Sequence, residues 1–215
     1  MEQYRLDFDA LILAGGRSSR LGGVPKQGLV FQGATLLEKS LAAAAGASRA
    51  VVVGPDPGLL PEGVLSCREQ PVFAGPAAAV AAGLEALANA GSGSAFTLVL
   101  ACDMPRISSA VQVLRKALES REFRADGLMA CGEDGRSQQL AGFYRTDVLT
   151  RAVKELASRD ALISGSMRAL LASLDLQLVT VPTGSTDDVD TWDDAAALGV
   201  DAGSRDPFPD RRGSS

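Results

Sequence analysis

Residues 10–26 read ALILAGGRSSRLGGVPK, and they are the most informative stretch of this 215-residue sequence. The aliphatic run at 10–13 predicts a buried strand, and the doubled glycine after it predicts a loop that a ligand can approach closely. The stretch also holds Arg17, Arg20 and Lys26 but no acidic residue. Glycine amides, a planar guanidinium and a flexible ammonium together suit a polyphosphate. A surface turn with solvated charges is the alternative interpretation.

Two common phosphate-binding loops are excluded by spacing. Lys26 lies between Pro25 and Gln27, so the Gly-Lys-Ser/Thr sequence of a P-loop is absent. The glycines of this stretch do not follow the G-x-G-x-x-G pattern of dinucleotide-binding loops either. Neither kinase-like nor dehydrogenase chemistry is therefore supported.

Composition excludes further classes of function. The chain has no histidine, which excludes imidazole bases, histidine-containing triads and histidine metal sites. Cys67, Cys102 and Cys131 lie far apart, so we expect reduced thiols and no zinc ribbon. A net charge of −5 argues against a nucleic-acid-binding surface. Because neither a signal-peptide core nor a membrane span is apparent, we expect a soluble, cytoplasmic protein.

Aliphatic runs alternate with segments of helical pattern along most of the chain. Strands are expected at 8–13, 50–54, 64–67, 96–102, 127–131, 140–144 and 176–181, and helices at 35–45, 75–90, 108–120, 147–157 and 191–198. This alternation predicts one α/β domain over residues 1–200, with a Rossmann-like, mostly parallel central sheet flanked by helices on both faces. Residues 201–215 are rich in Gly, Ser, Pro and charge, and they predict a disordered C-terminal tail.

Asp103 directly follows the expected strand at 96–102, and Pro105 prevents the strand from continuing. Ligands of open α/β sheets bind beyond the carboxyl ends of the strands, so Asp103 is expected to face the same crevice as the glycine loop. A carboxylate there suits Mg²⁺, which also takes phosphate oxygens as ligands. A turn-forming role is the alternative for Asp103.

Residues 13–26 resemble the signature of nucleotidyltransferases that activate sugars, isoprenoid precursors and molybdopterin. The doubled glycine is most similar to the molybdenum cofactor guanylyltransferase family, and weaker matches extend to about Leu198. The resemblance implies a nucleotidyltransferase fold and transfer of GMP from GTP to the phosphate of molybdopterin, with loss of pyrophosphate. It implies nucleotide contacts from Leu13, Ala14, Gly15, Gly16, Arg20, Lys26 and Asp103, of which Arg20, Lys26 and Asp103 are the catalytic candidates.

The base site is assigned to a second segment. Gly75-Pro76 resembles the Gly-Pro that this family places beside the purine, and a proline in the first turn of a helix is its structural interpretation. Guanine presents two adjacent donors, which one carboxylate can accept, so Glu69 is our candidate for base recognition. Relatives carry an acidic residue further upstream, where this chain has Arg68, so the assignment requires a shifted loop.

An acidic cluster precedes the last expected helix. Asp188, Asp190 and Thr191 match a short acid- or Asn-bearing element that this family often carries there. The resemblance adds Asp188 and Asp190 to Asp103 as candidate ligands of Mg²⁺. Asp190 or Thr191 capping the helix is the structural alternative.

The acceptor site is weakly marked. Arg136 precedes an expected strand, and Arg168 lies where residues 164–168 open a possible helix, whose N-terminus favours an anion. These two arginines are our candidates for binding the acceptor phosphate, with ordinary surface charge as the alternative. Besides GTP and molybdopterin, we expect at most transient contact with proteins that deliver or receive the molybdenum cofactor.

Two other functions remain open at this point. One is cytidylyl or guanylyl transfer to another small phosphorylated acceptor, and the other is a non-catalytic nucleotide-binding regulator. Pro25 stands where close relatives often have Asp before the lysine, which is the one departure within the basic loop. The presence of Asp103 together with Arg20 and Lys26 argues against an inactive site.

Overall fold

The computed structural model describes residues 6–16, 18–120 and 123–203. Within this part of the chain, seven strands form the central sheet in the order β5-β4-β1-β6-β8-β7-β9. Their bounds are β1 Phe8–Leu13, β4 Ala50–Val53, β5 Val64–Cys67, β6 Phe96–Ala101, β7 Gly127–Cys131, β8 Ser137–Arg145 and β9 Leu176–Thr180. Neighbouring strands are parallel except that β8 runs antiparallel to both β6 and β7. The predicted mostly parallel sheet is therefore confirmed.

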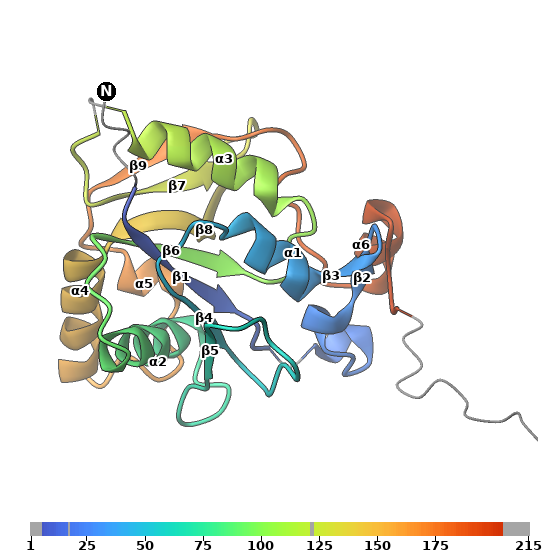
Figure 1. Ribbon diagram of the computed structural model, residues 1–215, viewed down its shortest axis with the longest axis horizontal. Coiled ribbons are helices and arrows are strands. Elements are labelled where there is room, and N and C mark those ends of the chain that lie inside the picture. The colour runs from blue at the N-terminus through green and yellow to red at the C-terminus, as the bar shows by residue number, and fades with distance from the viewer. Residues whose placement is uncertain (1–5, 17, 121–122, 204–215) are drawn as a thin grey trace, which may run out of the picture.

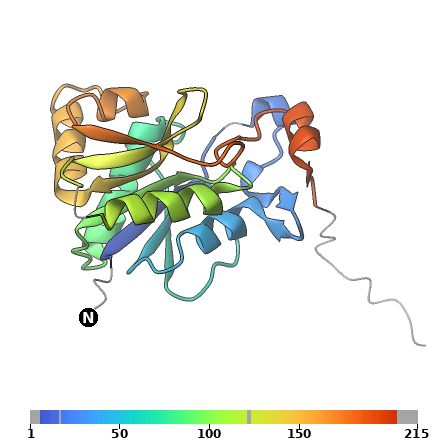
Figure 2. The ribbon, with the colours of Figure 1, turned by 90° about the horizontal axis from the view of Figure 1, so that it is seen from above.

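Helices cover both faces of this sheet, as Figures 1 and 2 show. Helices α1 (Leu36–Ala43) and α3 (Ile107–Leu118) lie on one face, whereas α2 (Pro76–Asn89), α4 (Thr146–Ser158) and α5 (Met167–Leu170) lie on the other. Alternate residues of β1 point to opposite faces of the sheet. On one face, Phe8, Ala10 and Ile12 pack toward α1 and α3. On the other face, Leu11 and Leu13 pack toward α2 and α5. No helix of the described residues is long and apolar enough to span a bilayer.

A second, smaller sheet lies at one end of the molecule with the last helix (Figure 1). Strands β2 (Val30–Phe31) and β3 (Ala34–Thr35) form a tight hairpin, and β10 (Val200–Asp201) pairs with β2 from the other end of the chain. Together with α6 (Trp192–Leu198) these strands enclose a third apolar core. The sequence did not predict this sheet, because two-residue strands are too short to show an alternating pattern.

The expected tail begins beside this sheet. Asp201 belongs to β10, and the part of the predicted tail from residue 204 onward lies outside the described residues. The other expected elements occur near their predicted places. The largest shift is in β8, which starts at Ser137 instead of residue 140, because its polar first residues still pair with β7 beyond an irregularity in register.

The strand register brings three loops to one edge of the sheet. Leu13 pairs with Val53 on one side and Ala101 on the other, so β1, β4 and β6 end side by side. Beyond these ends, Gly54 approaches the chain that follows β1. A Cβ atom on Gly54 would lie 2.8 Å from the carbonyl carbon of Ala14 and from the nitrogen of Gly15. A glycine is therefore required where the first loop leaves the sheet.

We expect Gly54→Ala to destabilise the protein by about 2 kcal/mol, because the added methyl group must displace backbone atoms rather than a flexible side chain. Urea denaturation measures this change in the free energy of unfolding. Gly93→Ala is the matched control, since a Cβ there meets no atom within 4 Å, and it should stay within about 0.5 kcal/mol of wild type. Equal stability of the two variants would contradict the close approach.

Candidate active site

A cavity of about 370 Å³ opens where β1 and β6 end. The structure brings nine of the predicted nucleotide-binding residues into its lining: Leu13, Ala14, Gly15, Gly16, Lys26, Glu69, Gly75, Pro76 and Asp103. These residues come from four separate segments that meet at the carboxyl edge of the sheet. Arg20 does not line the cavity itself, but it approaches Asp190 nearby.

The basic loop is folded through positive backbone angles. Ser18, Gly22 and Gly23 have φ of 44°, 66° and 86°, and the amides of Leu21 and Gly23 both donate to the carbonyl oxygen of Ser18 at 3.0 Å. Leu21 is fully buried in the third core, so the loop is anchored in its middle. Arg17, the other basic residue of this loop, lies outside the described residues.

Lys26 forms the centre of an ion cluster. Its Nζ lies 2.8 Å from Oδ2 of Asp103 and 2.5 Å from Oδ1 of Asp190. Burial alone would lower the pKa of Lys26, but the two carboxylates outweigh it and raise the pKa above the ordinary value. The Arg20 guanidinium adds a longer contact of 3.6 Å to Asp190. The charges of the basic loop and of the acidic segment, residues 188–190, thus neutralise each other.

The acidic segment is fixed by the residue between its two carboxylates. The amide of Val189 donates to the carbonyl oxygen of Asp103 at 3.0 Å, and its side chain is fully buried in the third core. Asp188 and Asp190 flank it. One carboxylate oxygen from each of them and one from Asp103 all lie within 4.8 Å of one another. Carboxylate oxygens are ligands that Mg²⁺ prefers, so this donor set fits the predicted metal.

Charge crowding affects this cluster. Burial, followed by repulsion from Asp103 and Asp190, raises the pKa of the Asp188 carboxyl above its ordinary value. Of the two residues proposed to cap the last helix, Asp190 and Thr191, the structure selects Thr191. Thr191 is the N-cap of α6, and its hydroxyl accepts from the amide of Asp194 at 3.1 Å in a complete capping box. Asp190 therefore keeps its carboxylate for the ion cluster.

Glu69 is a buried acid in the same cavity. Only 5% of the residue is exposed, and its Oε1 accepts from the amide of Phe73 at 2.9 Å. Its Oε2 is buried without a hydrogen-bond partner among the described residues. A buried carboxylate oxygen without a partner is unfavourable, so this acceptor is available to any donor that reaches it.

Gly75 and Pro76 connect the Glu69 loop to α2. Gly75 has φ of 96°, and a Cβ there would lie 3.2 Å from the carbonyl oxygen of Gly165. The amide of Ser164 donates to Ala74, and the amide of Ala77 donates to Gly165, so residues 164–165 brace this connection. Pro76 occupies the first turn of α2 and also lines the cavity, so its structural and functional interpretations are compatible.

The two acceptor candidates are in different places. Arg136 lines a second cavity of about 390 Å³, which also includes Gln138 and Asp188 and therefore adjoins the acidic cluster. Arg168 is exposed on α5 and lines neither cavity. The helix predicted there is a single turn whose N-cap, Ser166, already accepts from the amide of Ala169 at 3.1 Å. The structure thus brings only Arg136 near the metal candidates.

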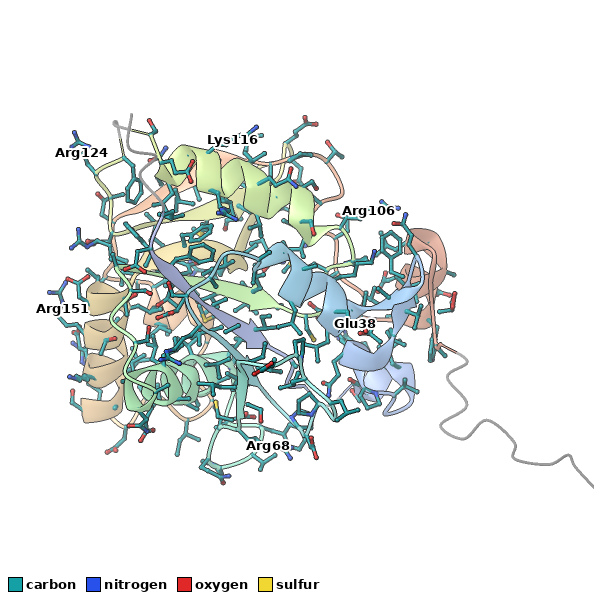
Figure 3. The ribbon with its side chains drawn as sticks, in the orientation of Figure 1. Glu38, Arg68, Arg106, Lys116, Arg124 and Arg151 are labelled. Carbon is teal, nitrogen blue, oxygen red and sulfur yellow. The ribbon has the colours of Figure 1, made fainter. Side chains whose placement is uncertain are left out.

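Sequence reasoning did not select several residues that line the first cavity, among them Arg68 and Phe73. Arg68 lies beyond the end of β5 (Figure 3), and its guanidinium carbon is 5.6 Å from the centre of the Phe73 ring. An aromatic residue in the loop just before Gly-Pro was the available signal, because such rings commonly contact ligands.

Comparisons with known proteins find similar sequences over most of the chain. A profile of the MobA-like NTP transferase domain matches residues 10–178. A Mycobacterium avium protein named "Probable molybdenum cofactor guanylyltransferase" is 33% identical over 188 residues, covering 82% of this chain and 87% of the relative. A protein of the same name from Mycobacterium marinum is 33% identical over 180 residues, covering 81% of this chain and 82% of the relative.

Two solved structures illustrate the shared fold. Molybdopterin-guanine dinucleotide biosynthesis protein A from Archaeoglobus fulgidus has a TM-score of 0.63 at 16% identity, covering 88% of this chain and 96% of that one. The 2-C-methyl-D-erythritol 4-phosphate cytidylyltransferase from Thermus thermophilus has a TM-score of 0.63 at 21% identity, covering 89% and 97%. At these identities the likeness extends to the fold alone.

We expect Lys26→Met to strengthen Mn²⁺ binding in the absence of nucleotide by about tenfold, because it removes the cation that competes for Asp103 and Asp190. Binding of GTP should weaken in the same variant. Calorimetric titration measures both. Lys116→Met is the control, since Lys116 is exposed on α3 and points away from the molecule (Figure 3). Unchanged metal affinity in Lys26→Met would contradict this interpretation.

We expect Asp188→Asn to raise the Tm of the metal-free protein at pH 7 by about 1–2 °C, a small effect because solvent screens this carboxylate. A raised folded-state pKa means that the charged form is disfavoured by folding, so the penalty develops as the pH rises through that pKa and is absent at low pH. Thermal unfolding in chelator tests it. Asp187→Asn, outside the three-carboxylate cluster, is the control, and a lower Tm for Asp188→Asn would refute the prediction.

Proposed function

The chain belongs to the MobA-like NTP transferase family, and on that premise we propose that it transfers GMP from GTP to the phosphate of molybdopterin. The products would be pyrophosphate and the guanine dinucleotide form of the cofactor. The names of the relatives support this acceptor and this nucleotide. The observation that carries the proposal is that a single cavity is lined both by Lys26 and Asp103 and by the buried carboxylate of Glu69.

Glu69 supports guanine as the base. Its buried Oε2 has no partner in the described part of the chain, and guanine offers N1–H and an exocyclic amine as adjacent donors. Adenine presents an acceptor where guanine has N1–H, so binding adenine would leave polar atoms unpaired. Base selection then follows from the cost of leaving this carboxylate without donors.

The basic loop supports a triphosphate as the other part of the donor. Lys26 can exchange its carboxylate contacts for phosphate oxygens, and Arg20 is largely exposed beside the same cluster, with 73% of its side chain accessible. Positive charge at this position stabilises the charge that develops on the departing pyrophosphate.

Asp103, Asp188 and Asp190 would hold Mg²⁺, and Asp103 is the best placed because only 17% of its side chain is exposed. When bound, the metal supplies positive charge to the phosphate oxygens around the reacting phosphorus. The acceptor is a phosphate monoester and is already anionic at neutral pH, so it can attack without a general base. The protein's task is then to position two substrates and neutralise their charge, which needs no histidine.

The second cavity supports an acceptor site next to the first. Its polar lining includes Arg136, which can pair with a phosphate, and Asp188, which belongs to the proposed metal site. Arg168 has no comparable position, and its part in acceptor binding stays a prediction. We also propose that the reaction occurs in the cytoplasm, where the product would pass by transient contact to proteins that use the cofactor.

Pyrophosphate release tests the proposal directly. Wild-type protein with Mg²⁺ should release pyrophosphate from GTP, but not from CTP or ATP, and only when molybdopterin is present. Asp103→Asn should lower turnover about a hundredfold or more, because it removes charge stabilisation at the reacting phosphate. Asp147→Asn is the control, since this carboxylate is exposed and pairs with Arg145 away from the cavity.

The other outcomes separate the remaining functions. Preferential use of CTP would identify a cytidylyltransferase. Release from GTP with a different phosphorylated acceptor would keep the chemistry and overturn the acceptor. Binding of GTP without release, under every acceptor condition, would identify a nucleotide-binding regulator.

A further inference from the structure

The loop that carries Glu69 also presents an aromatic ring to the same cavity. Phe73 lines this cavity, yet 46% of the residue is exposed. We infer that the Phe73 ring is the surface on which the nucleotide base stacks, and that it contributes base affinity separately from the edge contact of Glu69. This inference rests on the proposed function, since it requires a nucleotide in this cavity.

The backbone of Phe73 has an unusual conformation. Its φ is 64°, in the left-handed region that bulky side chains rarely adopt. Such a conformation persists only where surrounding contacts enforce it, and it is frequent at ligand sites. Here the Phe73 amide donates to Oε1 of Glu69 at 2.9 Å, and the amide of Ala74 donates to the carbonyl oxygen of Pro71 at 3.1 Å. The turn therefore fixes the carboxylate and the ring relative to each other.

The ring also has a cation over it. The guanidinium carbon of Arg68 lies 5.6 Å from the ring centre, which is within the range of a cation–π contact. Arg68 lines the cavity as well, so a positive group and an aromatic face lie together in its lining. A ring held in this way loses little freedom when a base binds to it.

An exposed phenylalanine can instead belong to a protein-binding patch. Val72 and Ile163 are also exposed, at 39% and 60%. Ile163 lies close to this loop, because the amide of the next residue, Ser164, donates a hydrogen bond to the carbonyl oxygen of Ala74. Of these three apolar residues, however, only Phe73 lines the cavity. Its position therefore favours a flat ligand in the cavity over a protein partner on the outer surface.

Stacking and edge recognition make different demands on the base. Every base has an aromatic face, so a stacking surface adds affinity without reading donors or acceptors. Glu69 reads the donor pattern of guanine, and inosine lacks the exocyclic amine. Phe73 should therefore support GTP and ITP equally, while Glu69 should distinguish them.

The test measures equilibrium binding by the purified full-length chain with Mg²⁺ and without acceptor. Phe73→Leu should weaken binding of both GTP and ITP by about tenfold, because a stacked base is lost in each case. Phe73→Tyr should bind as wild type does, and inorganic tripolyphosphate should bind equally to all variants. Glu69→Gln is the contrasting variant, in which the preference for GTP over ITP should disappear.

A folding control accompanies this series. Phe73→Gly suits the positive φ, so it should keep or raise the Tm while losing the same binding as Phe73→Leu. Unchanged GTP binding in both variants would overturn the inference. A loss confined to GTP would overturn it too, because Phe73 would then act only by positioning Glu69.

The same measurements separate this inference from the proposed function. A wild-type chain that binds GTP through Phe73 but releases no pyrophosphate with molybdopterin would refute the proposed reaction and leave the stacking surface established. Tighter binding of CTP than of GTP, with both weakened equally by Phe73→Leu, would refute guanine selection only. If the wild-type chain binds tripolyphosphate as tightly as it binds GTP and ITP, the base adds no affinity and the stacking surface is overturned.

Discussion

The contacts of the Lys26 ammonium with Asp103 and Asp190 join three distant segments of the chain, and the shape of the active-site cavity depends on them. The partners lie 77 and 164 residues away from Lys26 in sequence. Exposed ion pairs contribute little, but the side chains of Lys26 and Asp103 are only 18% and 17% exposed, so solvent screens this pair less. Removing the cation would also leave two carboxylates close together. The basic loop and the acidic segment are thus mutually required.

This ion cluster is held in place by a small apolar core at the edge of the molecule. Leu21 of the basic loop and Val189 of the acidic segment are both fully buried in it. Pairing of β10 with β2 closes the same core from the end of the domain. Because Val189 also donates to the carbonyl oxygen of Asp103, its neighbours Asp188 and Asp190 are fixed beside the end of β6. The third core therefore supports the ion cluster as well as the fold.

The sequence predicted what local patterns encode. The buried strand at 8–13, the glycine loop after it and Asp103 at the end of a strand follow from periodicity and from the rule that ligands bind at carboxyl ends. The contact between Lys26 and Asp190 depends on the pairing of two-residue strands from opposite ends of the domain, which no local pattern encodes. Charge and position in the sequence also marked Arg136 and Arg168 alike, because sequence does not tell which way an exposed side chain points.

The proposed base site and the proposed transfer site depend on different parts of the structure. Glu69 and Phe73 are held by their own turn, which rests on α2 and on residues 164–165, whereas Lys26 and its acids rest on the third core. A change in the turn that holds Glu69 and Phe73 would alter which base fits without disturbing the proposed phosphate contacts. The proposed base contacts and the proposed phosphate contacts can therefore change independently of each other on the same fold.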